Sequence, residues 1–186
     1  MKKVSKLLIA TASTSSVLFP LFAVSCTNYK NSLQNKINDA KQKSKLAVFV
    51  KDYKDKYLNE IVKAEKVLKD EKATKEDYKN TLLEFEKNIE KILEENKTTT
   101  EKYGEYYKEA INLYNDLKAF AAEELSEEKF NELKKQIVAD YNAVWADLSK
   151  IEIHKFDEIK RKEFKTRIDN LLKKYKEAKQ KIIDGN

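Results

Sequence analysis

Proline and glycine are almost absent from this chain. Its single proline is Pro20, and its two glycines are Gly104 and Gly185. Sheets need frequent tight turns, and such turns use proline or glycine at special backbone dihedrals. A chain that lacks both residues over most of its length is therefore expected to fold into long helices joined by few turns.

Apolar residues recur at helical spacing. One series follows alternating steps of four and three residues: Tyr78, Leu82, Phe85, Ile89 and Ile92. A second series follows the same steps from Tyr103 to Ala121. Each series forms one apolar stripe along a helix. The sequence therefore predicts an all-α fold, built as an elongated antiparallel helical bundle or as stacked helical hairpins.

Helix-capping residues divide this pattern into elements. Thr74, Ser126 and Asp157 are suitable N-caps. Residues 98–101 have the capping-box pattern T-x-x-E. We therefore predict about five helices, at residues 31–70, 75–96, 101–124, 127–149 and 157–183.

The first of these helices is unusually long. It contains Ser44 and then the fully apolar run Leu46–Val50. We expect either a break near Ser44 or a buried helical segment at the apolar run. In both cases residues 36–186 form one helical domain.

Two segments about 50 residues apart have the same organisation. Residues 53–96 and 103–149 each contain an amphipathic helix, a capping residue, an aromatic residue four positions later and a second helix. A helical hairpin cannot bury its stripe alone, so stacking or bundling of such units follows. The two segments are either a true duplication or two unrelated amphipathic hairpins of similar appearance.

The N-terminal residues have the order of an export signal. A lysine-rich start at residues 2–6 is followed by a mostly apolar stretch at residues 7–24 and by a small-residue run that ends at Cys26. This order is typical of a secretory signal peptide. The alternative is an uncleaved spanning helix, which needs about 20 predominantly apolar residues. Threonine and serine residues and Pro20 interrupt the stretch and favour the signal peptide.

The run Ala23-Val24-Ser25-Cys26 resembles the lipobox of bacterial lipoproteins. The resemblance implies removal of residues 1–25 by cleavage between Ser25 and Cys26, and a diacylglyceryl lipid on the cysteine sulfur. Two acyl chains give stable membrane attachment. Residues 26–35 are then the lipidated cysteine and a short tether, and the domain lies on the outer face of the cell membrane. The lysine-rich composition fits low-GC bacteria such as mollicutes.

The surface charge divides along the chain. Residues 101–150 are acidic on balance, and residues 151–186 are basic. The last helix is therefore expected to pack against the acidic middle segment, although a basic amphipathic helix also suits anionic lipid, glycosaminoglycan or nucleic acid. Arginine, which forms forks to phosphate, occurs only at Arg161 and Arg167. We expect no nucleic-acid partner.

No pattern for catalysis emerges from the sequence. Cys26 and His154 are the only cysteine and the only histidine. Metal sites use clusters of Cys, His, Asp or Glu, whereas the glutamates here alternate with lysines on polar helix faces. We therefore expect no enzyme, no metal and no cofactor.

Aromatic residues concentrate in one part of the chain. They are Tyr103, Tyr106, Tyr107, Tyr114, Phe120, Phe130, Tyr141 and Trp145. They form either a wide apolar face buried between neighbouring helices or a contact patch, because Tyr and Trp are favoured binding anchors. Tyr106 and Trp145 are the residues that we select as a contact patch, and Trp145 is also a candidate for the core.

Residues 57–93 carry Ala64, Leu68, Thr74, Tyr78 and Leu82 at hairpin spacing. In this they resemble the FIVAR-type helical-hairpin repeats of Gram-positive and mollicute surface proteins. Residues 106–148 resemble these repeats less clearly. The resemblance implies a cell-surface spacer or binding module, and it supplies no catalytic residues.

Two functional hypotheses follow. The first is a lipid-anchored, non-enzymatic surface lipoprotein that binds a host extracellular protein or serves as a surface antigen. The second is a structural spacer or surface coat with no ligand. A transporter-associated solute binder is less favoured, because such proteins are usually α/β domains with a cleft. The apolar stripes suit a monomeric bundle and a coiled-coil dimer equally, so the oligomeric state stays open.

Overall fold

A computed structural model describes residues 28–185 of the chain. The predicted signal peptide, the predicted cleavage site and Cys26 lie outside these residues. Within them the helices are α1 (Tyr29–Leu46), α2 (Lys51–Lys69), α3 (Lys75–Ala119), α4 (Asn131–Leu148) and α5 (Glu158–Ile183). Short π or 3-10 segments occupy Phe120–Glu124, Glu128–Phe130 and Ile153–Lys155. The described residues contain no strand, which confirms the predicted all-α class.

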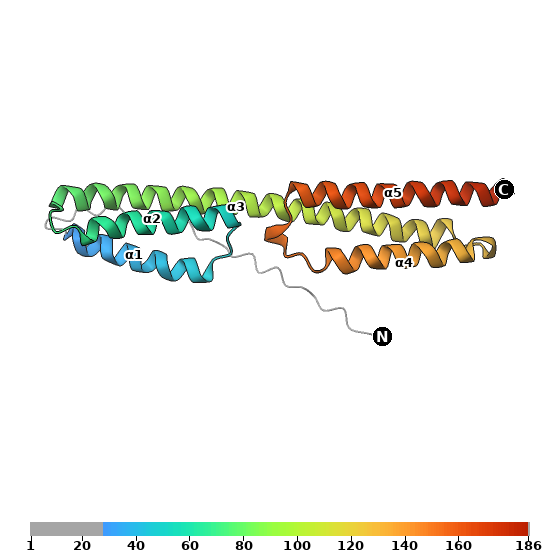
Figure 1. The fold of residues 1–186 in the computed structure, drawn as a ribbon, viewed down its shortest axis with the longest axis horizontal. Helices are drawn as coiled ribbons and strands as arrows, with labels where there is room; N and C mark the ends of the chain where they lie inside the picture. The colour runs from blue at the N-terminus through green and yellow to red at the C-terminus, as the bar shows by residue number, and fades with distance from the viewer. Residues whose placement is uncertain (1–27, 186) are drawn as a thin grey trace.

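The helices form a rod of two three-helix bundles that share α3 (Figure 1). The N-terminal bundle consists of α1, α2 and the first part of α3, which pack against one another. The C-terminal bundle consists of the second part of α3 with α4 and α5. A helix rises about 1.5 Å per residue, so the 45 residues of α3 span about 68 Å. This one helix sets the length of the rod.

Each bundle has its own hydrophobic core. The N-terminal core includes Leu33, Ile37, Tyr57, Ile61, Phe85 and Ile92. The C-terminal core includes Leu117, Phe130, Ile137, Leu148, Phe156, Ile168 and Tyr175. No residue of α3 between Asn96 and Ala110 is buried. The two cores are therefore separate, and α3 contributes to both.

Two predicted N-caps are confirmed. The Thr74 hydroxyl accepts a hydrogen bond from the Asp77 backbone N–H (3.2 Å), and the Asp77 carboxylate accepts one from the Thr74 backbone N–H (2.8 Å). This reciprocal pair is a capping box. The hydrogen bonds that Asp77 accepts from the side chain and backbone of Thr74 lower the pKa of Asp77. At the start of α5, the Asp157 carboxylate accepts a hydrogen bond from the Lys160 backbone N–H (2.9 Å).

The predicted break between residues 96 and 101 is wrong, because α3 runs through it. The capping pattern at residues 98–101 is not used as a cap. Instead Thr98, Thr99 and Thr100 donate their hydroxyl hydrogens to the backbone carbonyls four residues earlier (3.1, 2.9 and 2.8 Å). Helix α3 packs into the N-terminal bundle before these residues and into the C-terminal bundle after them, and this packing keeps them helical.

The predicted long first helix is two helices. The break comes at residues 47–50, just after the predicted position near Ser44. The run Leu46–Val50 is not a buried helical segment, because Leu46 is 86% exposed and only Phe49 is buried.

A buried amide from α3 holds this loop. The Asn96 side chain accepts a hydrogen bond from the Val50 backbone N–H (2.9 Å) and donates one to the Val48 carbonyl (3.0 Å). The Asn96 amide therefore pairs the Val48 carbonyl and the Val50 backbone N–H of this loop. Helix α2, which follows the loop, has no side-chain N-cap hydrogen bond of its own.

The first helix also begins earlier than predicted. Asn28 caps α1 by accepting a hydrogen bond from the Asn31 backbone N–H (3.2 Å). Leu33, within the expected tether at residues 26–35, is fully buried. Residues from Tyr29 onward therefore belong to the N-terminal bundle and not to a tether, because Leu33 is part of its core.

The start of α4 also differs from the prediction. Ser126 does not cap a helix, since its hydroxyl donates to the Glu123 carbonyl (3.0 Å). The chain instead passes through a 3-10 turn that buries Phe130, and α4 begins at Asn131. The helix predicted at residues 101–124 correspondingly ends in a π turn at Phe120–Glu124.

Both predicted hairpins exist, but they occupy different places in the bundles. Residues 53–96 supply the second and third helices of the N-terminal bundle. Residues 103–149 supply the first and second helices of the C-terminal bundle. The unit that recurs in the structure is therefore a three-helix bundle rather than a hairpin (Figure 1). None of the helices within residues 28–185 is long and apolar enough to cross a membrane.

Candidate contact surface on helix α4

Trp145, one of the two residues selected from the sequence, lies on α4 and is 42% exposed. Its ring packs against that of Tyr114 on α3, with ring centroids 5.1 Å apart and an interplanar angle of 30°. Tyr114 also contacts Tyr141 edge to face at 6.0 Å. Half of the indole is therefore supported by an aromatic neighbour, and the other half faces solvent.

Tyr106, the other selected residue, belongs to α3, which packs against α5, and is only partly exposed. The Arg161 guanidinium lies 4.9 Å from the centre of its ring, an arrangement that favours a cation–π interaction. Arg161 also forms two hydrogen bonds to Glu109 (2.6 and 3.3 Å). Tyr106 on α3 contacts Arg161 of α5, whereas Trp145 on α4 contacts Tyr114 of α3. The structure therefore does not bring Tyr106 and Trp145 together in one patch.

The exposed face of α4 around Trp145 carries almost no charge. Its exposed residues are Ala139, Asn142, Ala143, Trp145 and Ala146. The only charged residue between Gln136 and Ala146 is Asp140. We call these five exposed residues the α4 face. Charged residues make up 38% of the chain, so an uncharged helix face of this length is unusual for it.

Asp140 does not belong to the α4 face, because it is directed to α5. It accepts hydrogen bonds from the Tyr175 hydroxyl (2.6 Å) and the Lys174 ammonium (3.2 Å). The hydrogen bond from Tyr175 holds the pKa of Asp140 below its ordinary value, although burial acts in the opposite direction. Burial is in turn the main cause that raises the pKa of Tyr175.

This geometry predicts a pH dependence for the stability of the C-terminal bundle. The folded pKa of Asp140 is lowered from 3.8, so the unfolded chain binds the proton more readily. The carboxylate therefore stabilises the fold above that value, and its contribution is lost as pH falls through the folded pKa. We expect D140N to be destabilised by about 1 kcal/mol at pH 7. Urea unfolding should show that difference from wild type vanishing at low pH.

The matched control is D39N on the exposed side of α1. It is expected to leave the stability of the C-terminal bundle unchanged at every pH. A destabilisation of D140N that persists at pH values below the folded pKa of Asp140 would contradict the charge-based explanation.

Helix α5 meets the acidic middle segment along its whole length. Four ion pairs link them: Arg161–Glu109 (2.6 Å), Arg167–Asp147 (2.7 Å), Lys174–Asp140 (3.2 Å) and Lys179–Glu124 (2.5 Å). Such pairs contribute little stability individually at a surface. They do confirm the prediction that the basic last helix packs against residues 101–150.

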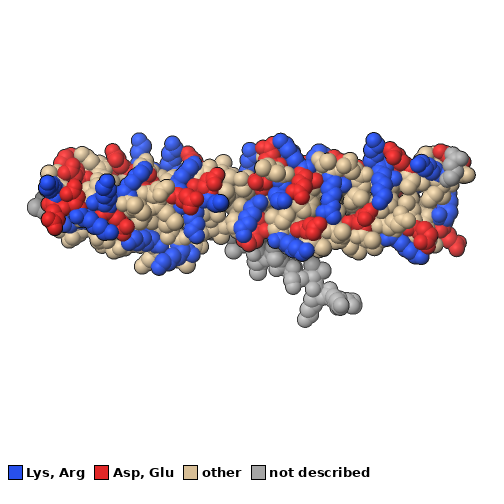
Figure 2. Space-filling model, viewed as in Figure 1, with Lys and Arg blue, Asp and Glu red and all other residues tan. Residues whose placement is uncertain are grey.

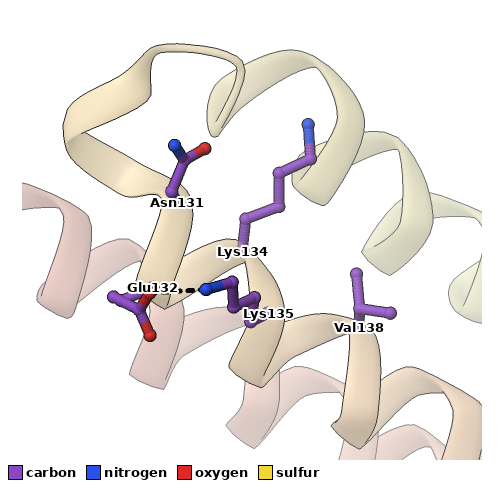
Figure 3. A pocket seen from close by; sticks show the side chains of 5 residues that line it. All are labelled: Asn131, Glu132, Lys134, Lys135 and Val138. Carbon is purple, nitrogen blue, oxygen red and sulfur yellow. Dashed lines mark hydrogen bonds and ion pairs between the residues drawn. The ribbon is translucent and has the colours of Figure 1, made fainter.

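The remaining surface offers little for chemistry. Figure 2 shows lysines and acidic residues interspersed over both bundles. A shallow hollow at the start of α4 is lined by Asn131, Glu132, Lys134, Lys135 and Val138 (Figure 3). Glu132 and Lys135 pair with each other there at 2.7 Å. His154 lies in the turn before α5, 3.4 Å from Glu152. Residues 28–185 contain no group of three or more His, Cys, Asp or Glu that could hold a metal ion.

Comparisons of the chain with protein-family models, curated proteins and solved structures found no match. The functional argument therefore depends on the sequence features and on the geometry of the two bundles. Within that geometry the α4 face combines a 42% exposed tryptophan with neighbouring exposed residues that carry no charge. The sequence carried a signal for it that we did not use, namely a run from Gln136 to Ala146 with one charge.

Proposed function

We propose that this chain is a lipid-anchored, non-enzymatic surface lipoprotein that contacts another protein through the α4 face. The observation that carries the proposal is an exposed tryptophan on an uncharged helix face. Partly exposed Trp is a frequent energetic centre of protein–protein interfaces. Interface centres are also depleted in charge. Alanines beside the tryptophan would allow close approach of a partner backbone.

The position at which α1 starts supports the anchored arrangement. Asn28, the cap of α1, follows Cys26 by two residues, which span at most about 7 Å. Helix α1 begins at one end of the rod, and α4 belongs to the other half (Figure 1). A lipid on Cys26 would thus hold the N-terminal bundle at the membrane and leave the α4 face on the bundle remote from the anchor.

The chemistry of the α4 face favours a protein partner. Nucleic acids and anionic lipids are bound mainly through charge, which this face lacks. The face is also small compared with a stable interface, which buries about 800 Å² per partner. We therefore propose a contact of modest affinity, such as adhesion to a host extracellular protein.

A structural spacer is the second candidate. The observation that favours it is the continuous helix α3, which spans both bundles and sets a fixed length. Both bundles also complete their cores without a partner. A spacer would carry the lipid anchor but retain no partner.

The anchor is tested by detergent phase partition. We expect the wild-type chain to enter the detergent phase and Cys26→Ser to remain in the aqueous phase, because the serine cannot be lipidated. The matched control is Ser25→Ala, which keeps a small residue before the cleavage site and should behave as wild type. A Cys26→Ser chain that still enters the detergent phase would mean that residues 7–24 anchor it as a spanning helix.

The contact is tested by binding to immobilised host extracellular proteins. We expect Trp145→Ala to weaken binding by about 2 kcal/mol, or about 30-fold, as for an interface hot spot. Ile159→Ala is the matched control, because Ile159 is a large apolar residue of the same bundle, 74% exposed and outside α4. Equal binding by both variants, or no binding by the wild type, would favour the spacer.

A further inference from the structure

Between the two bundles, α3 continues without a core around it. We call Lys97–Tyr103 the joint. Just before it, the side chain of Asn96 holds the loop of the N-terminal bundle. Just after it, Gly104 faces Ile153 of the C-terminal bundle, and a Cβ there would lie 3.9 Å from the Ile153 side chain. The joint is therefore about two helical turns that belong to neither core.

Few contacts bridge the joint. Among the described residues, none of the hydrogen bonds and ion pairs that we find joins α1 or α2 to α4 or α5. The Thr99 and Tyr53 hydroxyl oxygens, on α3 and α2, lie 3.2 Å apart, within hydrogen-bond distance. Burial is the largest cause that raises the pKa of Tyr103, and the charges of Asp157, which caps α5, and Asp52, in the first turn of α2, raise it further. These contacts are at the rim, so the straight shape depends mainly on the joint remaining helical.

The residues of the joint are weak helix formers. Three consecutive threonines occupy the joint and Gly104 follows it directly, and both residue types have low helix propensity. The threonine hydroxyls donate to the carbonyls four residues earlier. This kind of bond slightly destabilises helices and often bends them. The straight conformation is therefore least stable at this point of α3.

The joint also contains a capping-box sequence, Thr98 to Glu101, that could start a new helix at Thr98. If the helix opened before Thr98, its side chain would accept a hydrogen bond from the Glu101 backbone N–H, and the Glu101 carboxylate would accept one from the Thr98 backbone N–H. In the straight helix the Thr98 hydroxyl instead donates to the Glu94 carbonyl (3.1 Å). Both conformations satisfy the Thr98 side chain, so the sequence supports two arrangements of one segment.

We propose that the joint is a hinge, at which α3 breaks at Thr98 and the C-terminal bundle swings relative to the N-terminal bundle. The proposal goes beyond the proposed function, because it holds whether or not the chain is lipidated. In an anchored rod, the hinge would let the α4 face take different orientations toward a partner.

The test measures the distance between the bundles by double electron–electron resonance. Spin labels are placed at two exposed sites, with Asn59→Cys on α2 and Asn170→Cys on α5, in the Cys26→Ser chain. The expected result is two distance populations, one for the straight rod and one shorter. Thr98→Ala should reduce the shorter population about fivefold, because alanine cannot cap the new helix.

Two further variants complete the design. Thr98→Ser should keep both populations, because serine is an equally good N-cap. Thr166→Ala, on the exposed face of α5, is the matched control and should change nothing. A single narrow distance in the labelled chain with Thr98 intact would overturn the hinge. Two populations that Thr98→Ala leaves unchanged would overturn the assignment of the break to Thr98.

Discussion

Phe156→Ala is expected to lower the free energy of unfolding of the C-terminal bundle by about 3–5 kcal/mol, the usual effect of deleting a buried phenylalanine ring. Phe156 is fully buried although it lies in the connection between α4 and α5. Its ring meets that of Tyr107 edge to face at 5.3 Å and that of Phe164 at 5.6 Å. Without it, α3 and α5 would face an empty volume at the end of the bundle.

Hydrogen exchange resolved by segment checks this prediction. Backbone amides of α4 and α5 should exchange at least about 100-fold faster in F156A, since each 1.4 kcal/mol corresponds to a factor of ten. Amides of α1 and α2 should be unchanged, because Phe156 belongs to the C-terminal core alone. Ile159→Ala is the matched control, since its side chain is 74% exposed and should contribute little. Equal acceleration in all four helices would instead mean that the bundles unfold as one unit.

The sequence was sufficient for the parts of the fold that depend on local rules. Helix α5 follows from one apolar stripe and one cap, and its observed bounds lie within a residue of those predicted. The capping box at Thr74 is equally local, because both of its hydrogen bonds join residues three positions apart. The all-α class follows from the scarcity of proline and glycine.

The sequence misled where local and tertiary preferences compete. Residues 98–101 have a good capping pattern, yet α3 passes through them. The capping rule considers only the few residues around Thr98. The packing of α3 in the bundles before and after that point involves many more residues, and it keeps α3 continuous. The apolar run Leu46–Val50 misled for a related reason, because hydrophobicity does not reveal which residue of a loop turns into the core.

The candidate contact could be predicted only in part. The sequence analysis selected Trp145 as a candidate contact residue, but its exposure depends on the packing of α4 against α3. Tyr106 has the same residue type as many surface anchors, but α5 covers much of it through Arg161. Side-chain exposure follows from the tertiary partners of a helix, which spacing along one helix does not define.

Asn96 is the residue whose role no pattern in the sequence indicated. It has a position on α3 that looks like an ordinary polar site, yet it is 7% exposed. Its amide both donates to the Val48 carbonyl and accepts from the Val50 backbone N–H. The partners lie more than 40 positions earlier in the chain, so only the folded structure brings them together.

Asn96→Ala is therefore expected to lower the free energy of unfolding of the N-terminal bundle by about 3 kcal/mol. Each buried polar group left unpaired costs about 1–3 kcal/mol, and this change leaves one donor and one acceptor without partners. Segment-resolved hydrogen exchange should show faster exchange in α1 and α2 and no change in α4 and α5. The matched control is Asn80→Ala, an exposed asparagine of the same helix.

Asn96→Asp separates the two hydrogen bonds of this side chain. A carboxylate can accept from the Val50 backbone N–H but cannot donate to the Val48 carbonyl. It would also place a charge in a buried position, which is costly without a paired cation. We therefore expect N96D to be at least as unstable as N96A. A fully stable N96D would mean that the donor bond contributes nothing and that the loop is held by the buried ring of Phe49 instead.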